Sequence, residues 1–247
     1  MNISSNEIVR VEHLDAGFGA SRVLHDVSLS ARENEITVIL GPSGCGKTTL
    51  LKHLIRLHQP WRGSIRLFGQ EITAMDEPQF NRILRRIGVL FQNGALLNSI
   101  TVAENVAIPL RQHTSLPPNI IQRLVRVKLN VVNLVHAADL YPAELSGGMR
   151  KRAALARAIA LDPPLLFGDE PSAGLDPVTC ASLDRLILKM KQDLGVSVLL
   201  VSHVVSSVKR IADRVIYLDR GEVLFSGTLQ EAYGAGIKKI DDFFQMG

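Results

Sequence analysis

The chain has 247 residues, of which 46% are apolar, and its 28 Lys and Arg against 24 Asp and Glu give a formal net charge of +4. This length and composition predict an ordinary globular protein with a sizeable core. The charges are spread along the sequence rather than gathered into a basic stripe, so we expect no nucleic-acid partner.

Membrane-spanning and disulfide-rich classes are not favoured either. The longest apolar stretches, such as 36–40 and 196–201, are far shorter than the roughly 20 residues that a membrane helix needs. The first twenty residues include three acidic ones, unlike a signal peptide. Two cysteines, Cys45 and Cys180, do not form a disulfide framework. We therefore expect a cytoplasmic chain without a disulfide.

The chain opens with β-rich segments at 8–14, 22–30 and 35–40. The third is a continuous apolar run, typical of a strand that is covered on both faces. It is followed by a glycine-rich stretch and then by apolar residues at helical spacing, which end before Pro60. We therefore expect strand, loop and helix in this order.

The middle of the chain, about 93–160, has helical patterns and no strand-like run. Thr101 and Glu104 are spaced as a capping box, and a second helical pattern follows Pro117 and Pro118. This part is expected to be an inserted helical lobe between two parts of the core, 1–92 and 161–247, within a single domain that spans 1–247.

Apolar runs return at 165–167 and 196–203, and the segment 214–227 reads as a hairpin with its turn at 219–221. Strands that are separated by helices predict a mostly parallel, helix-covered sheet. The expected fold class is α/β, with this core sheet, an N-terminal antiparallel β region and the inserted helical lobe.

The sequence GPSGCGKT at 41–48 matches the phosphate-binding pattern G-x-x-x-x-G-K-[ST], with a buried strand before it and a helix after it. Its backbone N–H groups can surround phosphate oxygens, and Lys47 and Thr48 can reach the β and γ phosphates and Mg²⁺. The alternative, a glycine-rich turn that binds nothing, leaves Lys47 and Thr48 unexplained. The predicted nucleotide-binding residues here are Gly41, Pro42, Ser43, Gly44, Cys45, Gly46, Lys47, Thr48 and Thr49.

Three carboxylates follow the apolar run at 165–167, in the sequence GDEPSAGLDP. An acidic pair at the end of a buried strand is costly unless a cation compensates it. A phosphate-binding loop of this kind (P-loop) holds Mg²⁺ near the end of the neighbouring strand. Asp169 is therefore predicted as a metal ligand together with Thr48. Glu170 is predicted as the base that deprotonates the attacking water. The alternative for Glu170 is a solvated loop acid.

The sequence LSGGM at 145–149 begins a helix with a serine cap and two glycines, which gives a second helix N-terminus able to bind an anion. A hinge helix would look similar in isolation. Together with the P-loop and GDEPSAGLDP, however, this segment closely resembles the signature of ABC ATPases. The resemblance covers nearly the whole chain.

The resemblance implies a head-to-tail dimer that encloses two ATP molecules. Ser146, Gly147 and Gly148 would then contact the γ phosphate that is bound by Lys47 of the other copy. Asp176 matches an acid that lies across the dimer interface and does not bind the metal.

Further roles are implied by position. Gln92 matches the Q-loop glutamine, which reaches Mg²⁺ and the water and moves with the helical lobe. His203 matches the switch histidine, which contacts the γ phosphate and Glu170, and Phe18 matches an aromatic residue that stacks on adenine. The alternatives are an ordinary surface glutamine, a core histidine and a core phenylalanine.

One residue departs from the family pattern. Gly168 stands before Asp169 where a large apolar residue is usual, and glycine weakens a strand unless another group approaches closely. We therefore expect unusual packing at Gly168. Cys45 lies where the P-loop often has a small residue, so a catalytic thiol is not expected.

The segments 91–117 and LSGGMRKRAALARAIALDP resemble the ATPases of Mla/Mce-type lipid transporters. This implies an ATPase subunit that powers phospholipid or related lipid transport. Its partners would be separate permease subunits and an Mce-domain lipid-binding protein, and it would be peripheral on the cytoplasmic face of the inner or plasma membrane. The alternatives are an importer ATPase for a small polar solute and a non-transport ABC protein. The lipid species and the direction of transport stay open.

Overall fold

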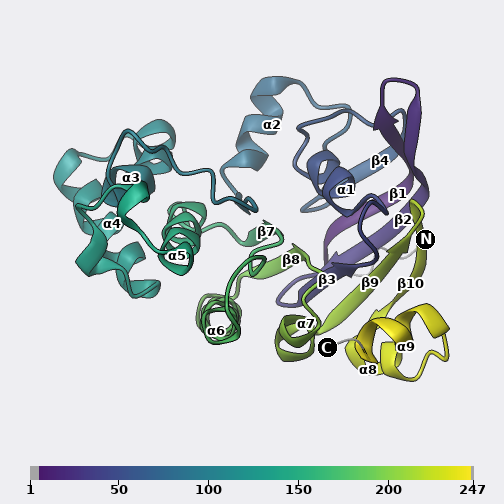
Figure 1. The fold of residues 1–247 in the computed structure, drawn as a ribbon. Coiled ribbons are helices and arrows are strands. Elements are labelled where there is room, and N and C mark those ends of the chain that lie inside the picture. The colour runs from purple at the N-terminus through teal and green to yellow at the C-terminus, as the bar shows by residue number, and fades with distance from the viewer. Residues whose placement is uncertain (1–5, 246–247) are drawn as a thin grey trace.

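The computed structural model describes residues 6–245, which fold into two β-sheets surrounded by helices (Figure 1). None of the helices in this range is both long and apolar enough to cross a bilayer. The strands are β1 (Glu7–Phe18), β2 (Ser21–Arg32), β3 (Ile36–Leu40), β4 (Arg62–Leu67), β5 (Gln70–Glu71), β6 (Ile87–Leu90), β7 (Leu165–Asp169), β8 (Ser197–Val201), β9 (Arg214–Asp219) and β10 (Glu222–Thr228). The helices are α1 (Lys47–Leu54), α2 (Glu77–Leu84), α3 (Val102–His113), α4 (Pro118–Val131), α5 (Gly147–Ala158), α6 (Pro177–Leu194), α7 (Val205–Ile211), α8 (Leu229–Tyr233) and α9 (Lys238–Gln245), with short 3-10 turns η1 (Val135–Ala137) and η2 (Pro142–Glu144).

The six-stranded sheet positions the functional site. Its strands lie in the order β10–β9–β3–β8–β7–β6, and all are parallel except β10, which is antiparallel to β9. Every residue of β3, β7 and β8 is buried, as expected for central strands covered on both faces. The predicted mostly parallel core sheet is therefore confirmed, and the carboxyl ends of β3, β6, β7 and β8 meet at one edge.

The four-stranded sheet is antiparallel, in the order β2–β1–β4–β5. It shares one apolar cluster with α1 and with one face of the six-stranded sheet. The predicted N-terminal β region is confirmed, but β1 and β2 are longer than the segments 8–14 and 22–30. The register shifts along β1, where His13 has φ 50°, break the alternation that a sequence pattern can detect.

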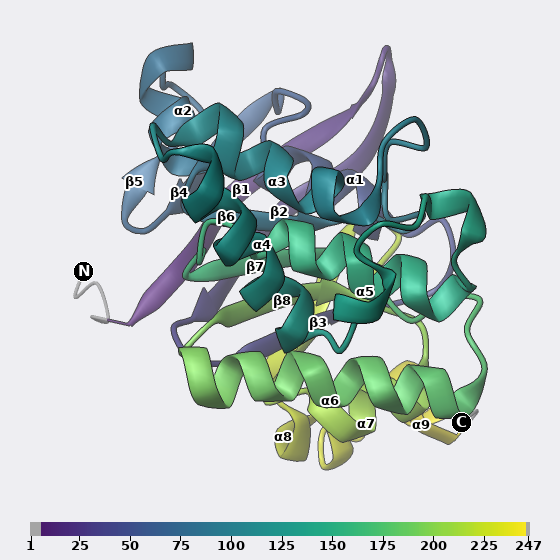
Figure 2. The same cartoon turned by 90° about the vertical axis from the view of Figure 1, so that its left-hand side faces the viewer.

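Helices α3, α4 and α5 form a group to one side of the sheets, which we call the helical lobe (Figure 1). Figure 2, in which the lobe faces the viewer, shows the long α6 crossing below it. The predicted capping box begins α3: Glu104 N donates to Thr101 Oγ1 at 3.2 Å, and Thr101 N donates to Glu104 Oε2 at 2.8 Å. The lobe and the second face of the six-stranded sheet share a single apolar cluster, so the lobe is packed on the core rather than tethered to it.

The turn between β9 and β10 is the predicted hairpin. Arg220 and Gly221 have φ 47° and 81° and connect the paired residues Asp219 and Glu222, which is the backbone of a tight two-residue turn. The turn also contacts the P-loop, because Gly221 N donates to Cys45 O at 3.0 Å. The hairpin turn therefore helps to fix the backbone of the P-loop at Cys45.

A buried carboxylate joins α6 to α7 and to the loop after β7. Asp184 is fully buried, and its Oδ1 accepts hydrogen bonds from Ser207 Oγ at 2.6 Å and Ser172 Oγ at 3.4 Å. Its Oδ2 pairs with Arg210, which is partly exposed. Ser172 lies in the loop after β7 and Ser207 on α7, the helix after β8. Asp184 therefore connects α6 to the segments that follow two neighbouring strands.

Replacing Asp184 by alanine should lower the free energy of unfolding by about 1–3 kcal/mol, since two buried hydroxyls lose their acceptor while Arg210 can still reach water. Urea unfolding measures this loss. The matched control is Asp193→Ala on the same helix, because Asp193 is exposed and its nearest Lys189 atom is 4.0 Å away. That control should change stability by less than about 1 kcal/mol, and equal losses in both variants would contradict the assignment.

Candidate functional site

The P-loop connects β3 to α1 and has the backbone that its glycines permit. Gly41, Gly44 and Gly46 have φ 143°, 80° and 108°, a region that other residues rarely adopt. A Cβ on Gly41 would lie 2.0 Å from the carbonyl oxygen of Leu218, so only glycine fits there. Pro42, Ser43 and Gly44 are exposed, and Cys45, Gly46 and Lys47 are buried.

The first turn of α1 has no side-chain cap, which leaves backbone N–H groups directed out of the helix start. Lys47 Nζ donates to the carbonyl oxygens of Gly41 and Pro42 at 2.8 and 2.9 Å. Its side chain is 8% exposed. A buried ammonium group beside free N–H donors is suited to an anion with several oxygens, such as a polyphosphate.

Thr48 and Asp169 lie together although they are far apart in the sequence. Thr48 Oγ1 donates to Asp169 Oδ1 at 3.1 Å, and Asp169 is 8% exposed at the end of β7. The described residues contain no cluster of three or more His, Cys, Asp or Glu side chains for a metal. A hydroxyl and one carboxylate nevertheless fit Mg²⁺, which usually binds through one or two carboxylates together with substrate phosphates and water.

Glu170 begins the loop after β7, with its carboxylate held from both sides. Glu170 Oε1 lies 2.7 Å from His203 Nδ1, and Glu170 Oε2 accepts from His203 N at 3.3 Å. Glu170 has φ 49°, a conformation that is uncommon for a residue with a side chain and is found at functional sites. Glu170 is 8% exposed and the His203 side chain is 60% exposed. The pair can therefore present an oriented base toward solvent.

Gly168 has the close neighbour that its position predicts. A Cβ on Gly168 would lie 2.5 Å from Leu200 Cδ2, and Leu200 is its cross-strand partner on β8. The side chain of Leu200 thus occupies the space that a larger residue would need. The expected unusual packing is present, directly before Asp169.

Gln92 follows β6 by two residues and has an exposed side chain. Its backbone is held by α5, since Lys151 Nζ donates to the Gln92 carbonyl oxygen. Arg157, further along α5, donates to the carbonyl oxygens of Gly94 and Ala95 at 2.8 and 2.7 Å. These two cations were not predicted from the sequence, although a lysine among the buried alanines of α5 is an available signal.

The signature residues begin α5. Ser146 is the N-cap, and its Oγ accepts from Met149 N at 3.2 Å, so the predicted cap is present. Gly148 lies against α6, where a Cβ would be 2.5 Å from Thr179 Cγ2. Gly147 is exposed and the start of the helix faces outward, which leaves it accessible to another molecule.

Asp176 caps α6 in its own chain. Its Oδ1 accepts from Val178 N and Thr179 N, each at 3.0 Å, and its Oδ2 accepts from Thr179 Oγ1. These hydrogen bonds from Thr179 and Val178 lower the pKa of Asp176. Every contact described for Asp176 is within its own chain, and its predicted place at an interface between two copies stays a prediction.

Phe18 ends β1 and is exposed, so the alternative of a core phenylalanine is excluded. Its ring meets that of His58 edge to face, with the centroids 5.3 Å apart. His53, on α1, lies 5.8 Å from His58 and its Nδ1 is 2.7 Å from Thr49 O. His58 was not predicted, and it extends the exposed aromatic surface that Phe18 begins beside α1.

Cys45 faces into the protein rather than toward a ligand. Its sulfur lies 3.9 Å from Lys47 Nζ. Burial raises the pKa of the Cys45 thiol, against the opposing effect of Lys47. A thiol that is neutral and buried is a poor nucleophile, in agreement with the expectation that Cys45 is not catalytic.

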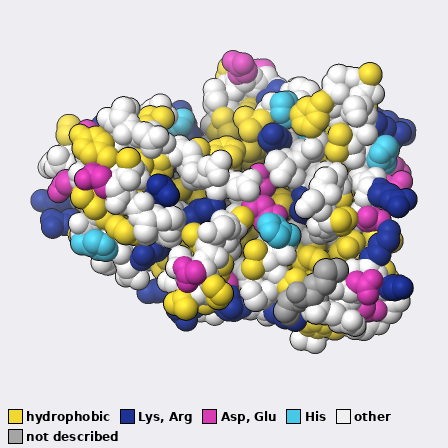
Figure 3. All heavy atoms as spheres, viewed as in Figure 1, with side chains coloured by type: hydrophobic (Ala, Val, Ile, Leu, Met, Phe, Trp, Pro, Cys, Tyr) yellow, Lys and Arg dark blue, Asp and Glu magenta, His cyan; other side chains and the backbone are white. Residues whose placement is uncertain are grey.

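Most predicted site residues therefore meet at the carboxyl edge of the core sheet. The P-loop follows β3 and Gln92 follows β6. Asp169 ends β7, Glu170 comes directly after it, and His203 follows β8. Figure 3 shows acidic side chains and a histidine next to each other where β7 and β8 end in Figure 1. The signature residues and Phe18 have no described hydrogen bond or ring contact with this group.

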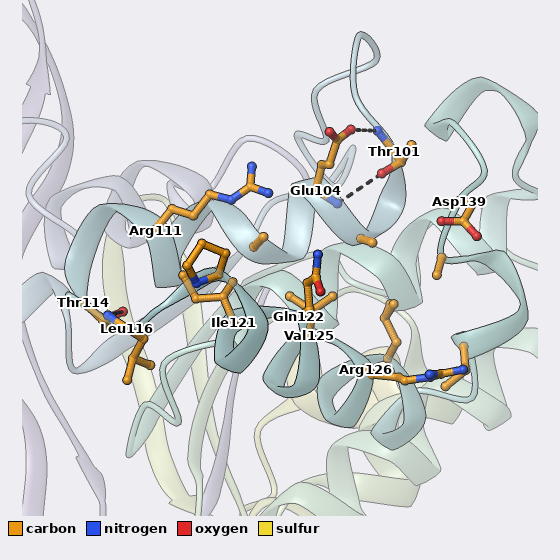
Figure 4. A pocket seen from close by; sticks show the side chains of 16 residues that line it. Thr101, Glu104, Arg111, Thr114, Leu116, Ile121, Gln122, Val125, Arg126 and Asp139 are labelled. Carbon is orange, nitrogen blue, oxygen red and sulfur yellow. Dashed lines mark hydrogen bonds between the residues drawn. The ribbon is translucent and has the colours of Figure 1, made fainter.

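A separate cavity of about 870 Å³ lies between α3 and α4 in the helical lobe (Figure 4). It has an apolar floor that includes Ile121 and Val125, and Arg111 and Arg126 stand around it. None of the predicted nucleotide-site residues lines it. The cavity is thus distinct from the site at the sheet edge.

Comparison with known sequences agrees with this geometry. Residues 24–173 match the family model described as ABC transporter. The chain is 40% identical over 227 residues to the intermembrane phospholipid transport system ATP-binding protein MlaF of Haemophilus influenzae, which covers 92% of this chain and 86% of that relative. It is 41% identical over 219 residues to the probable ribonucleotide transport ATP-binding protein mkl of Mycobacterium leprae, which covers 89% of this chain and 63% of that relative.

A solved structure has the same fold. The ATP-binding cassette MJ0796, in a dimeric post-hydrolysis state bound to ADP and Pi, matches with a TM-score of 0.82 and 30% sequence identity. The match covers 90% of this chain and 98% of that one. The α/β fold class is therefore confirmed by a solved relative over most of its length.

Replacing Lys47 by alanine should weaken nucleotide binding at least about 10-fold, because it removes a buried cation that can make charge-assisted hydrogen bonds of about 1.5–3 kcal/mol each. Titration with a fluorescent ATP analogue measures the affinity. Lys52→Ala, on the same helix but in its last turn, is the matched control and should bind normally. Parental affinity in Lys47→Ala would overturn the assignment of the P-loop.

Proposed function

The chain belongs to the ABC transporter ATPase family and hydrolyses ATP in support of transport, and from this premise we propose that it powers phospholipid transport through separate permease subunits. The observation that carries this proposal is the 40% identity with a phospholipid transport ATPase over 92% of the chain. The segments 91–117 and 145–163, on which the family resemblance was based, lie inside this shared length.

Hydrolysis is assigned to the group at the sheet edge. We assign Lys47 and the backbone of residues 41–49 to the phosphates, and Glu170 to the base that takes a proton from the attacking water. His203 orients the carboxylate of Glu170 through its ring and its backbone N–H. Phe18 is assigned to the adenine ring, because it is an exposed aromatic residue on the β-sheet next to α1.

Mg²⁺ is part of the proposal. Thr48 and Asp169 would hold the ion, since their oxygens lie 3.1 Å apart. We assign the exposed side chain of Gln92 as a further ligand. When bound, the ion would supply positive charge that stabilises the phosphates during hydrolysis.

A head-to-tail dimer is proposed for the ATP-bound state. The α5 N-terminus begins with the exposed Ser146 and Gly147, followed by Gly148, and no hydrogen bond described for Ser146 reaches the P-loop of its own chain. A helix N-terminus attracts an anion, and a second copy would supply one as the γ phosphate at its own Lys47. The related cassette MJ0796 is dimeric in its post-hydrolysis structure.

The membrane partners complete the proposal. The chain would be peripheral on the cytoplasmic face of the inner or plasma membrane, bound to permease subunits, with an Mce-domain lipid-binding protein in the same complex. The segment after Gln92 is suited to a permease helix, since Leu97 is 51% exposed while its backbone is held by Asn105 on α3. An exposed leucine on a fixed backbone is a good docking point.

A second candidate is an ATPase for import of a small polar solute. It is favoured by the 41% identity with the relative named as a probable ribonucleotide transport protein. The chain spans 63% of that relative, against 86% of the phospholipid transport relative. The match in length favours the phospholipid reading.

Glu170→Gln should keep nucleotide binding and slow hydrolysis by about 10²- to 10⁴-fold, the range for losing a general base. Steady-state phosphate release measures the rate, and light scattering should show a dimer that accumulates with ATP. Glu35→Gln is the control, since Glu35 directly precedes β3 at the opposite edge of the sheet. If Glu170→Gln turns over at the parental rate, the base lies elsewhere.

Leu97→Glu tests the transport proposal, because a charge in a buried interface is costly while an exposed position tolerates it in the free subunit. In the reconstituted complex it should abolish stimulation of the ATPase and lipid transfer, with unchanged nucleotide affinity in the isolated subunit. Leu194→Glu, at a position that is also 51% exposed, is the control. Full coupling in Leu97→Glu would remove the docking proposal, and a parental complex that moves a polar solute but no lipid would favour the second candidate.

A further inference from the structure

Lys151 is a buried cation at the site to which the proposed function gives no role. Lys151 lies on α5, four residues after its start at Gly147, and is 8% exposed. Its Nζ donates to the carbonyl oxygen of Gln92 and, at 3.4 Å, to that of Glu170. It therefore contacts the backbone of two proposed site residues, one after β6 and the other directly after β7.

We propose that Lys151 is a positioning residue that holds the backbones of Gln92 and Glu170 at a set distance from α5. It touches neither the nucleotide-binding P-loop nor the side chain of the base, so it acts through these two residues. The inference rests on the proposed role of Glu170 in hydrolysis. It adds a physical link between the helix that begins with the signature and the group that activates water.

Placing Lys151 at this point also balances charge. Asp169 and Glu170 are both 8% exposed, and two carboxylates with so little water need positive charge nearby. Burial lowers the pKa of Lys151, while Glu170 and Asp169 oppose this effect. The ammonium group of Lys151 thus adds positive charge near this pair, whereas Lys47 is bonded to the P-loop carbonyls.

A second cation on α5 holds the backbone just after Gln92. Arg157 donates to the next carbonyl oxygens, those of Gly94 and Ala95, and Ala95 has φ 50°. Ser146, Lys151 and Arg157 belong to one continuous helix and its cap. A contact of Ser146 with a second copy would consequently be transmitted to the backbone at Gln92 without an intervening flexible segment.

The test compares Lys151→Met, which keeps the apolar stem and removes the donor, with Lys151→Arg, which restores charge and donors. We expect Lys151→Met to lower kcat for ATP by about 10- to 100-fold, the effect of a misplaced catalytic group, and to leave KM within about 3-fold. Lys151→Arg should recover most of kcat. Because a loss of stability alone also lowers the apparent kcat at unchanged KM by reducing the folded fraction, kcat is expressed per molecule of folded protein, which is counted by the nucleotide-binding sites filled at saturation.

Lys128→Met is the matched control, since Lys128 is also a buried lysine of the helical lobe but pairs with Asp162 and contacts none of the site loops. It should leave kcat unchanged, whatever its effect on urea unfolding. If Lys151→Met does not fold, Lys151→Leu, which also lacks a donor, replaces it under the same criteria. Parental kcat in the Lys151 variant, or equal losses of kcat in the Lys151 and Lys128 variants, would overturn the proposal.

Glu170→Gln, measured in the same assay, distinguishes failure of the proposed hydrolytic role of Glu170 from failure of the positioning role of Lys151. If Glu170→Gln is slow and Lys151→Met is not, the positioning role fails and the hydrolytic site stands. If Glu170→Gln turns over at the parental rate, the proposed base is wrong, and the positioning role fails with it because Lys151 then has no base to place.

Discussion

The parallel alignment of β3, β6, β7 and β8 is the constraint on which the rest of the structure depends. It brings four carboxyl ends to one edge of the sheet, and each end supplies one part of the site: the P-loop, Gln92, the pair Asp169 and Glu170, and His203. The hydrogen bond between Thr48 and Asp169 joins residues 121 positions apart in the sequence. No local feature of the chain could place these groups together. The site depends on the parallel sheet, and a parallel sheet is stable only when both of its faces are covered.

This arrangement buries charged groups, which hydrogen bonds from both backbone and side chains stabilise. Asp169 accepts a hydrogen bond from the hydroxyl of Thr48. Glu170 accepts one from the backbone N–H of His203 and lies next to a ring nitrogen of the same residue. The lysine of the P-loop, Lys47, is bonded to carbonyl oxygens of its own loop. Neutral acceptors hold this ammonium group in place without cancelling its charge, so it can attract phosphate oxygens. An ion pair with a carboxylate would have weakened that attraction.

The sequence predicted those parts of the fold and site whose signals are local. The glycine spacing of the P-loop, the capping box at Thr101, the cap at Ser146 and the turn at 219–221 all depend on residues within a few positions of each other, and all are present. The contacts of Lys151 with Gln92 and of Asp184 with Ser207 are separated by 59 and 23 residues and left no periodic pattern. Strand β1 was predicted too short because its register shifts interrupt the alternation of buried and exposed residues, and β4, β5 and α2 were not predicted at all.

Gly168 shows how a local departure from a family pattern is resolved by packing. The space next to its Cα is filled by Leu200 of the neighbouring strand, which is itself almost fully buried. A side chain on residue 168 would have to displace the Cδ2 methyl group of Leu200, on the strand after which His203 follows. A small residue before Asp169, the proposed metal ligand, is compatible with the site because the adjacent strand supplies the missing volume.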